Sequence, residues 1–262
     1  MKSDALGDRI KSYEIAETGL KFINGLPIVV RLDGKSFHSF TKNMKKPYDQ
    51  DMMDLMDDTT KYLLEESGAI IAYTQSDEIS LILFPWLKNN EADLPFGGKK
   101  FKIISVLAST ATARFLKGAL ELFPDACARG LPRFDCRAFQ VPSKEEAIES
   151  LRWRAKDSLK NSVSMAARSH FSHKSLQNKT SSEMQEMLFQ EKNINFNNYP
   201  VRFKEGSFFK RKSIEVYLSE EELNKIPEDR RPVGPVIRSC ISIVDNPLKN
   251  KNVVDIVFET GI

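Results

Sequence analysis

The sequence predicts an α+β fold whose elements follow the order β-α-β-β-α-β of the ferredoxin-like split motif. Short apolar runs rich in strand-forming residues stand at 28–32, 69–84 and 134–141. Segments of helical length with apolar periodicity separate these runs. No internal repeat divides the 262-residue chain, which is long enough for one large core with additional helices and a C-terminal extension.

The first half of the motif follows a short N-terminal helix, which we expect at residues 6–17. The apolar run Ile-Val-Val-Arg-Leu at 28–32 predicts the first strand. A helix is expected over 49–67, because its apolar residues recur at helical spacing. Gly68 is the expected end of this helix.

The second half begins with two strands, at 69–75 and 79–84, which are joined by a tight turn. A helix over 99–120 and an alternating strand at 134–141 complete the unit. Beyond it, two further helices are predicted at 144–173 and 181–192. The last 50 residues are mixed in pattern, and we assign no elements there.

Acidic residues stand where two of the predicted strands end. Asp33 follows the first strand, and the hairpin turn carries Ser76, Asp77 and Glu78 in place of the usual Gly, Asn or Pro. Paired carboxylates beside buried strands repel one another and lose solvation, so they persist where a divalent cation neutralises them. Strand-end acids on neighbouring strands are how palm-type nucleotidyl transferases hold two metal ions, and the pattern therefore predicts phosphoryl transfer on a polymerase palm.

Composition indicates a globular chain in the cytoplasm. Hydrophobic residues make up 41% and charged residues 29%, with no apolar run long enough for a membrane and no secretory signal. The three cysteines are widely spaced, which favours reduced thiols. The net charge of +3 does not by itself indicate a nucleic acid, but residues 152–179 and 201–212 are locally basic and contain aromatics, which suits phosphate contact and base stacking. A solvated helix face is an equally good interpretation of either stretch alone.

Five segments together resemble the tRNA-histidine guanylyltransferase superfamily, in the same order and at similar spacing: residues 31–40, 73–78, 134–137, 153–161 and 193–198. The resemblance implies a reverse polymerase that adds nucleotides to the 5′ end of tRNA in the 3′ to 5′ direction. It implies a palm catalytic core with an N-terminal helix in residues 1–142, and an RNA-binding region packed on the palm in residues 143–262. It also implies two Mg²⁺ ions, ATP and GTP or other nucleoside triphosphates as substrates, and assembly as a homotetramer.

The resemblance also assigns roles to residues. Asp33, Gly34 and Asp77 would hold the metal ions, and Ser76 and Glu78 would complete the catalytic turn. The residues that would contact the nucleotide are Gly34, Lys35, Ser36, Phe37, His38, Lys46, Lys99 and Lys102. The residues that would contact the tRNA are Arg152, Arg154, Lys156, Lys160, Asn161, Lys210 and Arg211.

One departure bears on the substrate. The histidine-specific enzymes carry His-Ile-Asn-Asn where this chain reads Leu159-Lys160-Asn161-Ser162. The chain therefore looks more like the Thg1-like proteins, which repair 5′-truncated tRNAs by template-directed addition after ATP activates a 5′-monophosphate.

Three alternatives remain open. The first is nontemplated guanylyl addition to histidine tRNA. The second is a nonenzymatic RNA-binding module, although the first and third strands lack the exposed aromatics of such modules. The third is a nucleotide cyclase, which has no need of basic RNA-facing helices.

Overall fold

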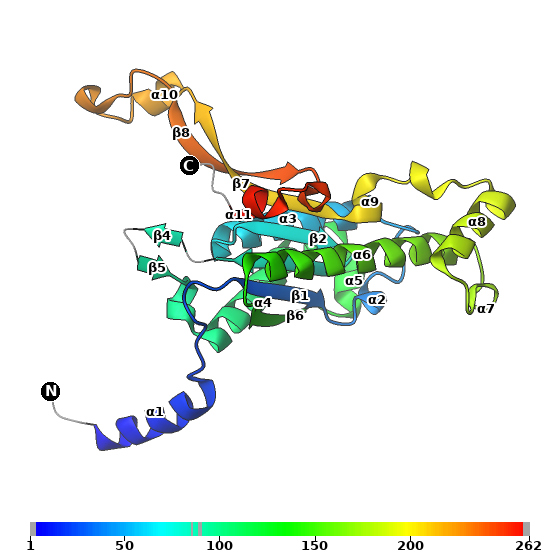
Figure 1. Cartoon of the computed structure of the whole chain (residues 1–262), viewed down its shortest axis with the longest axis horizontal. Coiled ribbons are helices and arrows are strands. Elements are labelled where there is room, and N and C mark those ends of the chain that lie inside the picture. The colour runs from blue at the N-terminus through cyan, green and yellow to red at the C-terminus, as the bar shows by residue number, and fades with distance from the viewer. Residues whose placement is uncertain (1–3, 85, 89–90, 259–262) are drawn as a thin grey trace.

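The protein is built around a six-stranded antiparallel sheet with the strand order β6-β1-β3-β2-β7-β8 (Figure 1). The structure is a computed structural model, and it describes residues 4–84, 86–88 and 91–258. The strands of the sheet are β1 (Ile28–Gly34), β2 (Ile71–Gln75), β3 (Glu78–Leu83), β6 (Phe134–Gln140), β7 (Ser207–Val216) and β8 (Val236–Val244). Two short strands form a separate hairpin, β4 (Trp86–Lys88) with β5 (Glu91–Asp93).

Helices surround the sheet and connect its strands. The longer ones are α1 (Ala5–Thr18), α3 (Gln50–Ser67), α4 (Lys100–Leu122), α6 (Lys144–Arg168) and α8 (Ser181–Lys192). The shorter ones are α2 (Phe37–Phe40), α5 (Pro124–Arg129), α7 (His173–Leu176), α9 (Val201–Glu205), α10 (Glu220–Leu223) and α11 (Val253–Phe258). Single 3₁₀ turns are η1 (Pro95–Gly98), η2 (Phe196–Asn198), η3 (Glu228–Arg230) and η4 (Pro247–Lys249).

The predicted element order is found in the first half of the chain, where β1, α3, β2, β3, α4 and β6 follow one another. Helix α3 begins where the sequence indicates, because the Asp49 side chain caps it by accepting a hydrogen bond from the Met52 amide at 3.2 Å. It ends at Gly68, whose φ of 65° lies in the left-handed region. The helix predicted over 144–173 ends at Arg168, and α7 follows after a short turn.

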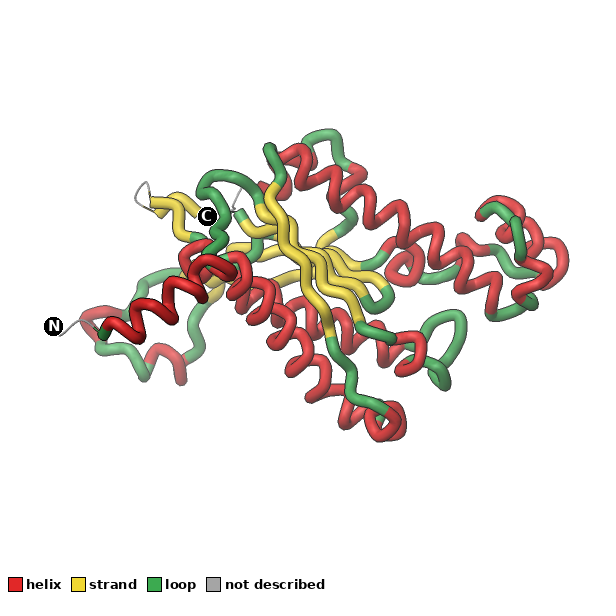
Figure 2. The backbone as a smooth tube through the Cα atoms, turned by 90° about the horizontal axis from the view of Figure 1, so that it is seen from below, coloured by secondary structure: helices red, strands yellow, loops and turns green. Residues whose placement is uncertain are grey.

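Both faces of the central strands are covered, because alternate residues of a strand point to opposite sides. On one side Val30 and Leu81 pack with side chains of α3 and α4, including the fully buried Phe115. On the other side Val29 and Ile82 pack with Ile148 of α6 and with α11. The tube view shows helices on both sides of the strands (Figure 2). The sheet is therefore the middle of three layers.

Helix α6 runs past the sheet and carries α7 and α8 at its far end (Figure 1). A third apolar cluster, which includes Val163, Leu188 and Phe203, holds this end together. Helix α1 and the outer part of the β7–β8 hairpin project from the body: α1 has no buried side chain, and the outer part of the hairpin is largely exposed (Figure 1).

The β7–β8 hairpin is the main feature for which the sequence pattern gives no prediction. Only the first residues of β7 pair with β2, from Thr74↔Ser207 to Ile71↔Lys210. Beyond them the strand pairs with β8 alone and loses its buried face. Because a strand without a buried face has no apolar alternation, periodicity does not reveal it.

Helix α4 is long and apolar enough to cross a membrane by length and composition, but this is weak evidence for a span. Five of its side chains, Ile103, Leu107, Ala111, Phe115 and Ala119, are buried. The same helix packs against α3 and β6. This is the pattern of a helix within a protein core.

Replacing Phe115 with Ala should destabilise the fold by about 3–5 kcal/mol, because the substitution leaves a cavity where this ring now packs against three others. The ring centroids of Phe37, Phe134 and Phe40 lie 5.3, 5.5 and 5.8 Å from that of Phe115. Urea unfolding followed by circular dichroism measures the loss. Phe189→Ala is the control, since that ring is 51% exposed. Equal losses in the two variants would contradict the assignment of Phe115 to the core.

Candidate active site

The end of β1 and the β2–β3 turn meet at one edge of the sheet. Strand β1 pairs with β3 so that Asp33 lies opposite Glu78. The backbone N–H of Gly34 donates a hydrogen bond to the carbonyl oxygen of Asp77 at 3.0 Å. This bond places the two predicted metal-binding acids, Asp33 and Asp77, on adjacent segments of backbone.

The turn itself is tight and internally braced. Gln75 pairs with Glu78, so only Ser76 and Asp77 lie between the strands. The φ of Ser76 is 55°, a left-handed conformation that is uncommon for a residue other than glycine. Its hydroxyl donates a hydrogen bond to the Asp77 carboxylate at 3.0 Å. Ser76 therefore shapes the turn and orients the acid at the same time.

The electrostatics of the turn favour a cation. Burial raises the pKa of the Asp77 carboxyl, and the negative charge of Asp33 raises it further, while the Ser76 hydroxyl and His38 lower it. The described residues contain no cluster of three or more His, Cys, Asp or Glu side chains arranged to hold a metal. Two carboxylates and a nearby backbone carbonyl are nevertheless the hard oxygen donors that suit Mg²⁺, which normally completes its shell with water and substrate phosphates. The residues at this edge fit Mg²⁺ on those terms.

Glu78, the third acid, is engaged elsewhere. The Arg154 side chain from α6 donates two hydrogen bonds to its carboxylate, both at 2.6 Å. Burial raises the pKa of Glu78, and the ion pair with Arg154 offsets part of that rise. Of the predicted catalytic residues, Glu78 is thus tied to a helix, whereas Asp33 and Asp77 are not.

Gly34 is required by the close approach of Phe37. An added Cβ would lie 2.4 Å from the Phe37 ring, which packs against Phe40 and Phe134 in the core. The chain between them turns through Ser36, whose φ of 58° is again left-handed. Residues 34–38, which the resemblance assigns to the nucleotide, therefore wrap tightly around a core aromatic ring at the end of β1.

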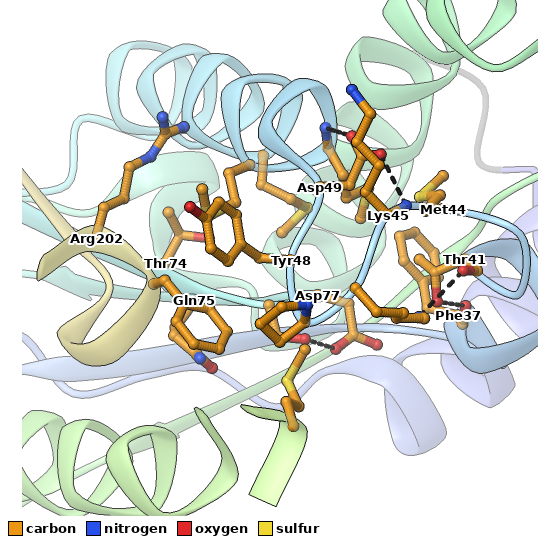
Figure 3. A pocket seen from close by; sticks show the side chains of 18 of the residues that line it. Phe37, Thr41, Met44, Lys45, Tyr48, Asp49, Thr74, Gln75, Asp77 and Arg202 are labelled. Atoms are coloured by element: carbon orange, nitrogen blue, oxygen red, sulfur yellow. Dashed lines mark hydrogen bonds between the residues drawn. The ribbon is translucent and has the colours of Figure 1, made fainter. Parts of the chain in front are cut away.

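A cavity of about 260 Å³ opens beside the turn (Figure 3). It brings together five residues with predicted catalytic or nucleotide-binding roles, namely Phe37, His38, Lys46, Ser76 and Asp77. Tyr48, Met52 and Phe203 supply apolar wall. An apolar pocket with a few convergent polar groups is typical of a site for a small organic ligand.

Two predicted nucleotide contacts lie far from this group. Lys99 and Lys102 stand at the start of α4, which follows the Leu83 end of β3 rather than its Glu78 end. Lys99 pairs there with Lys21, ahead of β1. Helix α4 has 23 residues and is therefore about 34 Å long, so its first turn lies far from its last. Lys99 and Lys102 do not line the cavity of their own chain.

The predicted RNA contacts divide between two surfaces. On α6, Lys156, Lys160 and Asn161 are exposed and Arg152 is half-buried in an ion pair with Glu149. On β7, Lys210 donates a hydrogen bond to the carbonyl of Ile256, and Arg211 donates one to the Ser239 hydroxyl at 3.1 Å. The Arg154 side chain is turned inward to Glu78 instead.

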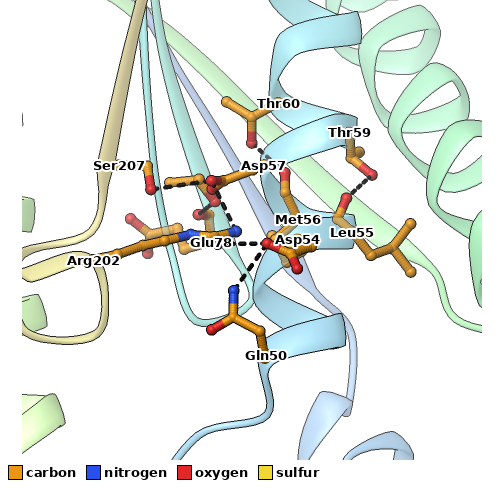
Figure 4. A network of polar contacts seen from close by, with 11 residues as sticks. Gln50, Asp54, Leu55, Met56, Asp57, Thr59, Thr60, Glu78, Arg202 and Ser207 are labelled. Carbon is orange, nitrogen blue, oxygen red and sulfur yellow. Dashed lines mark hydrogen bonds and ion pairs between the residues drawn. The ribbon is translucent and has the colours of Figure 1, made fainter. Parts of the chain in front are cut away.

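One polar network beside the cavity consists of residues that none of the sequence motifs includes. Arg202 of α9 donates a hydrogen bond to Asp54 at 2.5 Å, and its Nη2 lies 2.8 Å from Asp57, which accepts a bond from Ser207 (Figure 4). Burial raises the pKa of Asp57, and the charge of Arg202 opposes that rise. Asp57, Arg202 and Ser207 all line the cavity. The sequence does show Asp54 and Asp57 three positions apart, on one face of α3, and the basic stretch 201–212. These features suggest that each segment carries charge, but they do not show that the two segments meet.

Comparisons with known proteins identify the family of the chain. A family model described as tRNAHis guanylyltransferase (Thg1) matches residues 7–142, and one described as the Thg1 C-terminal domain matches residues 151–239. The tRNA(His) guanylyltransferase of Saccharomyces cerevisiae is 32% identical over 208 residues, which cover 73% of this chain and 85% of the yeast protein.

Two solved structures are also similar. A bacterial tRNA(His) guanylyltransferase (Thg1)-like protein in complex with ATP is 40% identical, with a TM-score of 0.74 over 79% of this chain and 87% of that one. A bacterial Thg1-like protein in complex with GTP is 32% identical, with a TM-score of 0.67 over 92% and 91%.

The α+β fold, the paired acids at the sheet edge and these matches define a nucleotidyltransferase. The chain belongs to the tRNA(His) guanylyltransferase (Thg1) family, and its similarity to the bacterial structures supports the Thg1-like subgroup.

Replacing Gly34 with Ala should destabilise the protein by roughly 1–3 kcal/mol, because the new methyl group collides with the Phe37 ring and neither can move freely. Thermal unfolding measures the change. Gly130→Ala is the matched control, since a methyl group added there would have nothing within 4 Å and the φ of 170° is open to any residue. A Gly34→Ala protein as stable as the control would show that the close approach of Phe37 places no demand on residue 34.

Proposed function

We propose that this protein adds nucleotides in the 3′ to 5′ direction to the 5′ end of truncated tRNA, using the opposite strand as template. The observation that carries the proposal is the convergence of Asp33, Gly34 and Asp77 beside a ligand-sized cavity, in a member of the Thg1 family. The strand order β6-β1-β3-β2, with α3 and α4 on one face, supports a ferredoxin-like polymerase palm as its scaffold.

The acids and the turn would hold two Mg²⁺ ions through Asp33, Asp77 and the Gly34 carbonyl. When bound, the ions would offset negative charge at the attacked phosphate. The protein's own contribution is positional: the Gly34–Asp77 backbone bond holds the end of β1 against the turn, and the Ser76 hydroxyl orients the Asp77 carboxylate before substrate arrives. Such preorganisation supplies much of the catalysis in phosphoryl transfer.

The cavity is the proposed nucleotide site, and two related structures are described as complexes with ATP and with GTP. His38 and Lys46 would contact the nucleotide, and the backbone of residues 34–38 would lie against the triphosphate. ATP would transfer its adenylyl group to a 5′-monophosphate end of the tRNA and release pyrophosphate. The 3′-hydroxyl of the incoming nucleotide would then attack the tRNA 5′ phosphate, forming a phosphodiester and releasing AMP.

The tRNA would lie along the exposed side of α6, with Arg152, Lys156, Lys160 and Asn161, and near Lys210 and Arg211 of β7. Lys99 and Lys102 lie at the opposite end of the sheet from the turn, so they would contact a nucleotide only in the site of another copy of the chain. Such a contact is consistent with the homotetramer that the resemblance implies, and we include this assembly in the proposal.

The nonenzymatic RNA-binding alternative is disfavoured by the covered sheet. Val29 and Ile82, on the face opposite α3 and α4, are 4% and 0% exposed beneath α6 and α11. An RNA-binding sheet stacks bases on an open face. Nontemplated guanylyl addition is disfavoured by Leu159 and Lys160, which replace the histidine-enzyme residues on α6.

Replacing Asp77 with Asn should lower nucleotide addition and 5′ adenylylation at least about 100-fold, because the amide keeps the shape but loses the charge. Affinity for tRNA in a filter-binding assay should change less than about twofold, since the acid faces the cavity rather than an RNA surface. Asp229→Asn is the control, because Asp229 is an exposed acid between β7 and β8. Near wild-type turnover at saturating Mg²⁺ would rule out the two-metal site.

Addition to a tRNA that lacks its first nucleotide should follow the template. Four such tRNAs, which differ only in the base opposite the missing position, should each receive the complementary nucleotide when all four triphosphates are present. Sequencing of the extended 5′ ends is the measurement. Addition of G to all four would instead support nontemplated guanylyl transfer.

A further inference from the structure

The guanidinium of Arg154 is fully engaged within the protein. Its Nε and Nη2 each lie 2.6 Å from an oxygen of Glu78, and its Nη1 lies 3.3 Å from Asp157. The side chains of Arg154 and Glu78 are only 18% and 17% exposed. A two-point pair of this kind fixes the orientation of both planar groups. Arg154 is therefore poorly placed to bind an RNA phosphate, which is the role that the resemblance assigns to it.

The partner of Arg154 is the first residue of β3. Glu78 directly follows Asp77 in the chain and lies opposite Asp33 in the sheet register. Because Ser76 and Asp77 alone separate Glu78 from β2, a movement of Glu78 must move the turn. The ion pair thus joins the turn to α6, through a residue 76 positions further along the chain.

The pair also controls the local charge. Asp33, Asp77 and Glu78 place three carboxylates at one edge of the sheet, and Arg154 balances Glu78, which lies directly opposite Asp33. Loss of the arginine would leave the largely buried Glu78 carboxylate without its hydrogen-bonded partner, beside two other acids and with the charge of Arg31 left to offset it. That carboxylate would attract a divalent cation in competition with Asp33 and Asp77.

We propose that Arg154 is a positioning residue of the nucleotidyl-transfer site, which holds Glu78 against α6 and so fixes Asp77 and keeps Glu78 away from the cation. The proposal rests on the proposed function of the same site. It makes the orientation of the catalytic turn depend on α6 as well as on the sheet.

The test compares Arg154→Ala, Arg154→Lys and Glu78→Gln with the double variants Arg154→Ala/Glu78→Gln and Arg154→Lys/Glu78→Gln. Arg114→Ala is the matched control, because Arg114 forms the same two-point pair with Asp58 at 2.8 Å, between α3 and α4. Each protein is assayed for kcat and KM on a 5′-triphosphorylated tRNA lacking its first nucleotide. Each is also assayed for tRNA affinity by filter binding and for Mn²⁺ affinity by calorimetry without tRNA.

Arg154→Ala should lower kcat about 100-fold, as expected when a remote contact misplaces a reacting group. Its tRNA affinity should stay within about twofold of wild type, since no phosphate contact is lost. Mn²⁺ should bind more tightly to Arg154→Ala than to wild type, because Glu78 is released. The double variant Arg154→Ala/Glu78→Gln should regain part of the lost kcat and return toward wild-type Mn²⁺ affinity, because the buried charge at position 78 is removed together with its partner.

Arg154→Lys should fall between wild type and Arg154→Ala, since a single ammonium cannot form the two-point contact. If Arg154→Ala does not fold, the Lys variant with and without Glu78→Gln provides the same comparison.

A large loss of tRNA affinity with unchanged kcat would overturn the proposal and assign Arg154 to RNA binding. Additive effects of the two substitutions on kcat and Mn²⁺ affinity would overturn it as well.

The Mn²⁺ measurement separates this proposal from the proposed function. If the wild type adds no nucleotide but Arg154→Ala still binds Mn²⁺ more tightly in a Glu78-dependent way, the pairing is supported and the substrate assignment fails. If the wild type adds nucleotides and neither Arg154→Ala nor Glu78→Gln changes the Mn²⁺ affinity, the proposed function is supported and the positioning role of Arg154 is ruled out.

Discussion

The burial of β1 and β3 on both faces is the constraint on which the rest of the molecule depends. Strands covered by helices on each side admit few charged residues within their length, because a buried charge loses its solvation. The end of β1 and the turn before β3 fall at the same edge of the sheet, because the two strands are antiparallel and in register from Ile28↔Leu83 to Asp33↔Glu78. Charge is therefore scarce within β1 and β3, where Arg31 lies over the Trp153 ring of α6, and the acids lie at the edge of the sheet.

The sequence was sufficient for this part of the structure because its signals are local. Apolar runs reveal buried strands, and an acidic turn in place of Gly or Asn is visible without any partner, so the β-α-β-β-α-β order and the meeting of Asp33 with Asp77 could be predicted. The β7–β8 hairpin could not, because its outer part has no buried face and therefore no periodicity.

Long-range pairing accounts for what the sequence could not supply. Arg154 stands in a basic stretch, and no pattern near it indicates that its charge is balanced by Glu78. For Arg202, the acids Asp54 and Asp57 on α3 and the basic stretch 201–212 are each visible in the sequence, but nothing in it pairs them. Lys99 shows a different limit of the sequence. Its position matches a family motif, but the match does not tell at which end of the sheet the residue lies. Ion pairs between distant segments are set by the assembled fold and carry no signature in either segment.

Helix α1 shows how unevenly stability is distributed along this chain. None of its 14 residues is buried, and an isolated helix of that length is marginal in water. Its amide hydrogens would exchange with solvent by local fraying, at rates unrelated to the global unfolding that limits exchange in β1 and β3. The order of this helix is therefore decided by its own short-range hydrogen bonds, and it can melt and reform without disturbing the edge of the sheet where Asp33 and Asp77 meet.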